Sequence, residues 1–268
     1  MSRGSHSLSP WRIPWLDLMA AAALVFLFAP MAIIILFSFN DSPAISLPIR
    51  GLSVRWYQSV LTSPQFLSAL KNTLVVGSAT SALAMGVGTL SAFGFTRYRF
   101  RFRNLLRTIT ILPIALPALF LGLSLLSFFS LLDFRLSMTT VVVGHLIYTL
   151  PYFVLVANAR LERFPVAIEE AARDLGASAW QTFWRVTFPI VGPSIVGAGI
   201  LVFALSFDEF LITFFLIGSE STLPMLVWSM MRRSIDPRVN AISTLVIGLS
   251  MIVILIMGRF VKLSDVTV

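Results

Sequence analysis

The chain has 268 residues, of which 57% are hydrophobic and only 12% are charged. Because ordinary soluble domains are about 25% charged, this composition excludes that class and predicts an all-α protein that crosses a membrane several times. The sequence contains no cysteine, which excludes disulfides and thiolate metal sites. The formal net charge is +8, but the basic residues lie in loops beside apolar segments, so we attribute the charge to membrane orientation rather than to nucleic acid binding.

The N-terminal part is predicted to consist of a polar arm, residues 1–15, and a first membrane span at residues 16–37. At 1.5 Å per residue this span is long enough to cross the roughly 30 Å of hydrocarbon. Small residues at 20–23 would also suit a cleaved signal peptide, but the apolar run continues well past them, which favours an uncleaved span. The stretch LSVRWYQSVL, residues 52–61, predicts a short interfacial helix.

Five further spans are predicted at residues 67–95, 108–131, 138–157, 190–217 and 239–257. The third span contains Pro113 and Pro117, which should bend or unwind it. The apolar piece at residues 222–231 is too short to cross. The expected membrane domain therefore extends over residues 16–262, with six transmembrane helices, and a tail follows at residues 263–268.

Six spans place both termini on one side of the membrane. Two basic residues in the arm, five after the second span, four in the central loop and two at the C-terminus give that side 13 lysines and arginines, against seven on the other side. Since cytoplasmic loops carry the excess of positive charge, the termini and the central loop are predicted to be cytoplasmic.

The central loop, residues 159–188, is the longest polar interruption of the chain, and it predicts two short helices. Pro165 suits the first position of a helix, Gly176 suits the left-handed residue that ends it, and Ser178 with Gln181 forms a capping box for the second. The first helix should have an apolar face of Ile168, Ala171, Ala172 and Leu175 and an opposite face of Glu169, Glu170, Arg173 and Asp174.

The pair Asp208–Glu209 is the strongest charge anomaly, because it lies inside the predicted fifth span, about 12–14 Å from its end. Carboxylates at that depth cost roughly 2.5–3.5 kcal/mol each. They should therefore attract cations on a translocation path, or form ion pairs with an arginine of an outer loop or of another subunit. His145, in the fourth span, is expected either to hydrogen-bond between helices or to take part in the path.

The sequence offers no sign of covalent chemistry. It contains no G-x-x-x-x-G-K-[ST] loop for ATP, and His6 and His145 have no metal-ligand spacing. We therefore expect no catalytic residue, metal or cofactor in this chain.

The central loop, EEAARDLGASAWQTFWRVTFPIVGPSI, resembles the EAA signature of permease subunits of ATP-binding-cassette importers. Glu170, Ala171, Ala172 and Gly176 match the signature, and Thr187–Phe188–Pro189 departs slightly from its usual Leu-Pro end. The stretches FNDS, RWY, TRYRFRFRN and LPMLVWSMMRRSIDPRVNAISTL look like the second permease of the spermidine/putrescine importers.

The resemblance implies the six-helix type I importer fold and a coupling helix that docks in a separate ATPase. The implied coupling residues are Ile168, Glu169, Glu170, Ala171, Ala172, Asp174, Leu175 and Gly176, with Glu170 making the polar contact and Gly176 setting the angle between the two helices. The implied substrate path includes Trp56, Ser206, Asp208 and Glu209. Closure of two ATPases would move the helix and switch the side to which the cavity opens.

The implied partners are a second, homologous permease, two ATPases that bind ATP and Mg, a solute-binding protein and the lipids of a bacterial inner membrane, with no nucleic acid.

One departure from the family pattern concerns the solute: where polyamine members carry an acid after a proline of the third span, this chain has Ala118 after Pro117. Amino-acid-like compounds, opines and organophosphonates therefore stay open as solutes. Two other classes also stay open, an exporter or channel and an intramembrane enzyme that uses Asp208, Glu209 and His145.

Overall fold

The computed structural model describes residues 14–42, 49, 51–233 and 236–266. The predicted arm, residues 1–15, lies outside the described residues except for its last two, and so do residues 267–268 of the predicted tail. The described residues form helices and no extended strand. In chain order the elements are α1 (Pro14–Ser38), α2 (Arg55–Leu61), α3 (Pro64–Arg97), α4 (Arg103–Ile111), η1 (Leu112–Ala115), α5 (Ala118–Leu131), α6 (Met138–Arg163), α7 (Val166–Asp174), α8 (Ala179–Thr182), η2 (Phe183–Thr187), α9 (Phe188–Phe207), α10 (Leu211–Leu216), α11 (Leu223–Arg233) and α12 (Arg238–Val266).

The long apolar helices confirm the expected membrane spans. Within the described residues, α1, α3, α6, the continuous run Ala179–Phe207 and α12 are each long and apolar enough to cross. The sixth candidate is a bent pair, in which α4 with η1 meets α5 at 113°. The bend occurs where Leu116 and Pro117 adopt extended backbone angles, as expected from a proline that cannot continue a helix.

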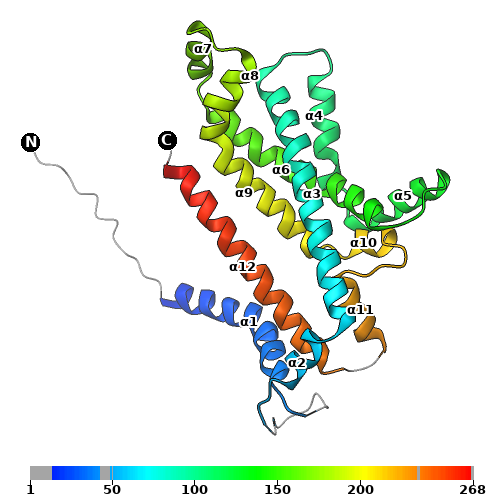
Figure 1. Cartoon of the computed structure of the whole chain (residues 1–268). Helices are drawn as coiled ribbons and strands as arrows, with labels where there is room; N and C mark the ends of the chain where they lie inside the picture. Colours follow the sequence, from blue (N-terminus) through cyan, green and yellow to red (C-terminus); the bar gives the residue numbers. More distant parts are fainter. Residues whose placement is uncertain (1–13, 43–48, 50, 234–235, 267–268) are drawn as a thin grey trace, which may run out of the picture.

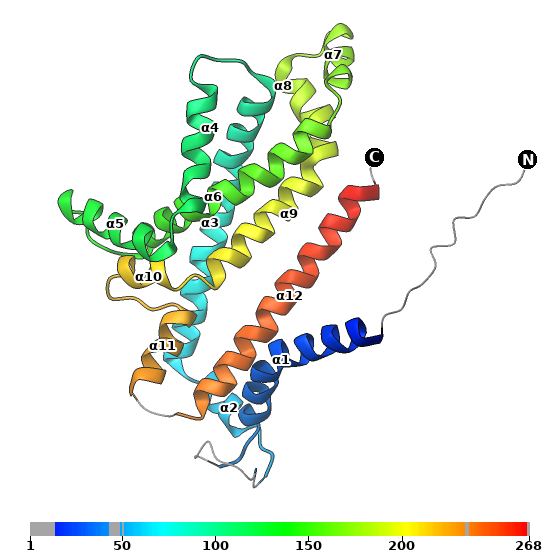
Figure 2. The ribbon, with the colours of Figure 1, turned by 180° about the vertical axis from the view of Figure 1, so that it is seen from behind.

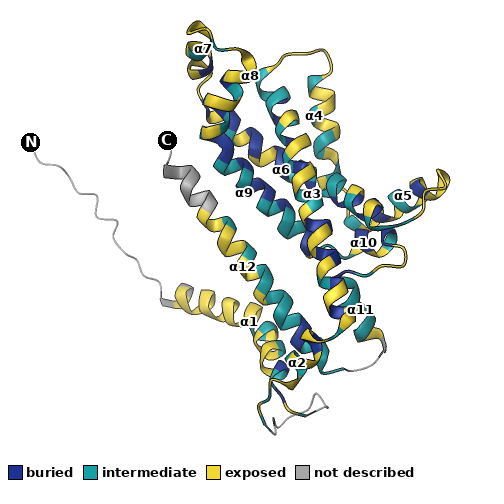
Figure 3. Cartoon of the chain, in the orientation of Figure 1, coloured by how far each residue is buried: buried dark blue, intermediate teal, exposed yellow. Residues whose placement is uncertain are grey.

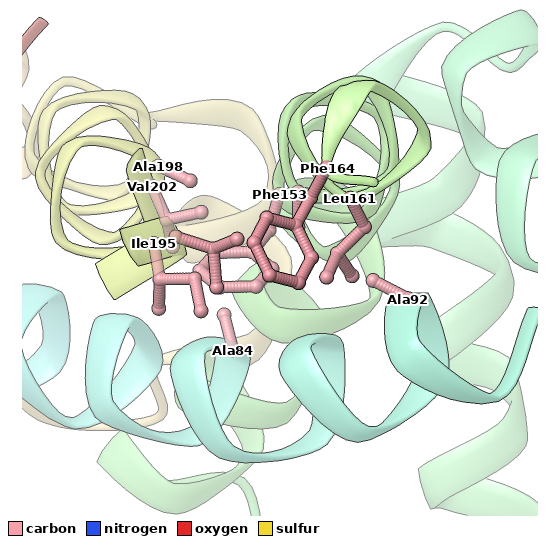
Figure 4. Close-up of a cluster of buried hydrophobic side chains, with 10 residues drawn as sticks. Ala84, Ala92, Phe153, Leu161, Phe164, Ile195, Ala198 and Val202 are labelled. Carbon is pink, nitrogen blue, oxygen red and sulfur yellow. The ribbon is translucent and has the colours of Figure 1, made fainter. Parts of the chain in front are cut away.

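The core is formed by α3, α6 and α9, which lie side by side along the molecule (Figures 1 and 2). Phe153 of α6 is fully buried and projects between Ala84 of α3 and Ile195 of α9 (Figure 4). Close packing requires small residues, and at Gly88 of α3 a β-carbon would collide with the Phe153 ring. This helix trio is the frame that carries the loops at both ends.

The two ends of the molecule differ. The hairpin of α7 and α8 lies at one end, towards which the C-terminal end of α12 also points, whereas α2 and α11 lie at the other (Figure 1). Helix α1 leaves the bundle, and most of its apolar surface is exposed (Figure 3), although its C-terminal part packs against α12. The apolar surface that its own chain leaves uncovered requires lipid or another subunit around it.

The expectation of one continuous fifth span over residues 190–217 is wrong. Helix α9 ends at Phe207, and α10 begins only at Leu211. The side chain of Glu209 accepts a hydrogen bond from the backbone N–H of Ile212 at 3.0 Å, so it caps the new helix instead of continuing the old one. The membrane-crossing run is instead extended at its other end, through α8 and η2.

Candidate coupling and translocation sites

The α7–α8 hairpin is built by two local signals in the sequence. Gly176 has a φ of +88°, and the N–H groups of Gly176 and Ala177 donate to the carbonyls of Arg173 and Ala172, which is the Schellman arrangement. Ser178 and Gln181 cap α8 reciprocally, at 3.2 and 3.0 Å, as expected. Pro165 lies one position earlier than expected, as the extended residue before α7.

The outward surface of α7 is both apolar and acidic. Ile168, Glu170, Ala171, Asp174 and Leu175 are all exposed, and Leu175 is 90% exposed. Ala172 is half-buried. The helix projects from the end of the molecule and is mostly exposed (Figure 3). An exposed apolar side chain of this size on a protruding helix is suited to docking in a groove of another protein.

Glu169 is the exception, and here the predicted face is wrong. Its side chain is buried and its Oε2 accepts a hydrogen bond from Nε of Arg97 at 2.9 Å. Its Oε1 accepts a second one from the Thr187 hydroxyl at 2.8 Å. Arg97 also donates to the carbonyl of Phe164 at 3.2 Å. The buried charge of Glu169 is tolerated because it is paired and both carboxylate oxygens accept hydrogen bonds. Since these bonds come from other elements, the carboxylate attaches α7 to the bundle and faces away from the outward surface.

Arg97 and Thr187 are residues that sequence reasoning missed. Arg97 is one of five arginines in eleven residues, and no pattern in that run singles it out. Thr187 ends η2, a π-helical segment, and such segments are rare and frequently occur at functional sites. The three side chains of Arg97, Glu169 and Thr187, which we call the α7 anchor, therefore join α3, α7 and η2.

The two acidic residues of the translocation candidate lie at the break between α9 and α10. Asp208 is exposed, and among the described residues its carboxylate contacts the Ser250 hydroxyl, at 3.4 Å from each carboxylate oxygen. Within the part of the chain that the structure describes, neither Asp208 nor Glu209 forms an ion pair. Sequence analysis allowed an ion pair between these acids and an arginine of an outer loop. The described part of this chain contains no such pair.

Ser206 and His145 form a bridge across the same break. The ring nitrogens Nδ1 and Nε2 of His145, on α6, lie 2.7 and 2.9 Å from the hydroxyls of Ser206 in α9 and Thr213 in α10. All three side chains are buried. His145 therefore makes interhelical hydrogen bonds, and it has no bond to Asp208 or Glu209 that would form a catalytic acid–base pair.

Trp56 lies on a different element from these residues. It is half-buried on α2, where its ring N–H donates to the carbonyl of Asn40 at 2.8 Å and Arg55 stacks 4.3 Å from the ring centroid. The structure therefore gathers Ser206, Asp208 and Glu209 at one break, with Ser206 turned inward, and leaves Trp56 on α2 at the end opposite α7 (Figure 1).

A cavity of about 710 Å³ opens at that end, between α3, α11 and the start of α12. Its polar lining includes Glu220, Asp236 and Arg238. Arg238 donates hydrogen bonds to both carboxylate oxygens of Asp236, at 2.6 to 3.1 Å, and these bonds hold the pKa of Asp236 below its usual value. Among the described residues, no group of three acids or histidines could hold a metal ion.

Comparison with known proteins adds a family and a fold. The family described as "Binding-protein-dependent transport system inner membrane component" matches residues 84–265. The chain is 35% identical over 248 residues to the putrescine transport system permease protein PotI of Escherichia coli K12, covering 90% of this chain and 86% of that protein. It is 29% identical over 235 residues to the spermidine/putrescine transport system permease protein PotC of the same organism, covering 87% and 89%.

Solved structures share the arrangement of helices. A bacterial alginate ABC transporter, crystallised with an alginate-bound periplasmic protein, contains a chain that matches with a TM-score of 0.72 at 15% identity, covering 94% of each chain. The MetNI methionine ABC transporter matches with a TM-score of 0.60 at 16% identity, covering 80% of this chain and 99% of the other. At these identities the likeness establishes the fold alone.

Proposed function

Because this chain belongs to the family of binding-protein-dependent transport system inner membrane components, we propose that it forms half of the path of an ABC importer and admits a polyamine to the cell. Transport subunits of this family lie in the inner membrane. The chain performs no covalent chemistry in this proposal, and hydrolysis of ATP takes place in separate subunits that bind ATP and Mg.

Coupling to ATP is assigned to α7. The observation that carries this assignment is the outward surface of Ile168, Glu170 and Leu175 on a helix that is attached to the bundle by the α7 anchor. A partner that pushes on this surface would act on α3 and η2 through the buried Glu169. The resulting movement would change which end of the path is open.

The proposed complex contains a second homologous permease, two ATPases and a solute-binding protein. The exposed apolar sides of α1 support a neighbour in the membrane, either lipid or the second permease. Both termini and α7 are assigned to the cytoplasm, because 13 of the 20 basic residues belong to that side in the proposed topology and because the C-terminal end of α12 points toward the end that carries α7 (Figure 2).

The solute class is supported by charge and by the relatives. PotI and PotC are named for putrescine and spermidine, and Asp208 and Glu209 are carboxylates without an intrachain cation in the described region. A relative of the same family, the sulfate transport system permease CysT of E. coli, is 29% identical over 227 residues. Family membership therefore does not fix the solute, and the absence of an acid at Ala118 is the one feature that favours an amino-acid-like, opine or organophosphonate solute.

The coupling role is tested in proteoliposomes that contain the complete importer, by measuring ATP-dependent uptake of radiolabelled putrescine. Replacing Glu170 by Ala should reduce uptake about tenfold, since an interfacial contact of this kind is worth on the order of 1.4 kcal/mol. The matched control is Glu162→Ala, an exposed acid at the end of α6. Unchanged uptake in Glu170→Ala, with the variant inserted normally, would contradict the role.

A further inference from the structure

A second cavity, of about 330 Å³, lies beside the break between α9 and α10. Asp208 and Phe210 line it from the break, Trp228 and Met231 from α11, and Ser243 from α12. The rings of Phe210 and Trp228 are 5.4 Å apart and inclined by 53°, so they form two walls of a corner. Sequence analysis singled out neither ring, because Phe210 lies within the apolar run of the expected fifth span and Trp228 within the short apolar piece at residues 222–231.

The cavity combines a carboxylate with aromatic faces. Among the described residues Asp208 has no cationic partner, and its contacts with Ser250 are long, at 3.4 Å. The Trp228 ring already holds a cation, because the guanidinium of Arg232 lies 5.2 Å from its centroid. Aromatic faces attract cations through the ring quadrupole, and most strongly when water is excluded.

A cover made only of lipid chains would leave the exposed carboxylate of Asp208 without a cationic partner among the described residues at membrane depth, which is costly. The cavity therefore faces a cation or water. We propose that it binds one alkylammonium group of the transported solute, with Asp208 pairing with the charge and the rings of Trp228 and Phe210 covering the cation and the adjacent methylene groups. This inference rests on the proposed function, and it assigns the solute-binding chemistry to two aromatic residues.

The test is equilibrium binding of radiolabelled putrescine to the complete permease–ATPase complex in nanodiscs, without the solute-binding protein, so that only the membrane site is measured. Trp228→Leu should raise the Kd about threefold to thirtyfold, and Trp228→Tyr, which retains an aromatic face, by less than about threefold. Trp15→Leu in α1, remote from the cavity lining, is the matched control and should leave the Kd unchanged. Trp15→Leu should also retain ATP hydrolysis stimulated by the binding protein, and all three variants should still insert in the membrane and assemble with the ATPase subunits.

Phe210→Leu provides an independent variant if Trp228→Leu does not assemble, and it should raise the Kd about twofold to tenfold. If wild-type complex binds putrescine and both leucine variants bind it equally well, the aromatic site is overturned and the proposed function stands. If the wild-type complex binds no putrescine and the complete importer takes up no organic cation, the solute class and the cavity's assignment are both overturned.

Discussion

Adjacent glutamates of the same short helix have opposite environments. Glu169 is buried and bonded to Arg97 and Thr187, whereas Glu170 is exposed. Helical periodicity alone predicts that neighbouring residues share a broad face, and it contains no information about which edge of a nine-residue helix meets the bundle. The burial of a charge is tolerated here because an arginine and a hydroxyl reach it from other elements, and neither partner is near in sequence.

Glu169→Gln tests the α7 anchor at the scale of one residue. The substitution leaves the buried Arg97 without its counter-charge, and breaking a pair of this kind costs about 3–5 kcal/mol. We expect the amides of α7 to exchange with solvent faster, and ATP hydrolysis to continue with greatly reduced uptake. The exposed acid Glu162, replaced by Gln, is the matched control.

A double-mutant cycle tests whether Arg97 and Glu169 act as a pair. Arg97→Gln should give the same phenotype as Glu169→Gln, and the double variant should lose less than the sum of the two, because the unpaired charge is then gone. If the two effects simply add, the residues do not act as a pair and the anchor as described is wrong.

At the scale of elements, much of the fold follows from the sequence because it depends on length and local signals. Apolar runs long enough for the bilayer predict the spans, Pro113 and Pro117 predict the bend between η1 and α5, and Gly176 predicts the end of α7. The break at Asp208 was missed because the apolar run continues on both sides of it. The inward position of Ser206 was missed because its partner, His145, belongs to another helix.

Gly176→Ala tests whether the angle between α7 and α8 matters. The residue has a φ of +88°, and a β-carbon in that conformation costs about 1–2 kcal/mol. We expect the hairpin to lose its fixed angle and uptake to fall severalfold while insertion of the chain is unaffected.

The matched control is Gly94→Ala in α3, where an added β-carbon would meet open space and φ is not positive. This variant should be neutral, since alanine is the better helix former. Equal activity of Gly176→Ala and the control in the uptake assay would contradict a role for the turn in coupling.

At the scale of the whole molecule, the proposed transport cycle assigns different tasks to two groups of residues. In this proposal the α7 anchor transmits force from the ATPase, and the carboxylates at the α9–α10 break attract the solute. The break itself is bridged to α6 by the hydrogen bonds of His145 to Ser206 and Thr213. Both groups are connected to the same core of α3, α6 and α9 (Figure 4). Because the α7 anchor and the α9–α10 break are separate groups on this core, defects at the two places should be separable in the proposed cycle.

Asp208→Asn should therefore give the converse of Glu169→Gln. Removing the charge weakens the attraction for a cation, so uptake of putrescine should fall. The amides of α7 should keep their protection from exchange with solvent, and the binding protein should still stimulate ATP hydrolysis.

Asp133→Asn is the matched control, because Asp133 lies in a loop with a φ of 52° that asparagine also tolerates. The ratio of solute molecules taken up to ATP molecules hydrolysed measures the separation. A fall in this ratio for Asp208→Asn without any change in α7 protection is the expected result, and loss of α7 protection in this variant would mean that the carboxylate supports the fold rather than the path.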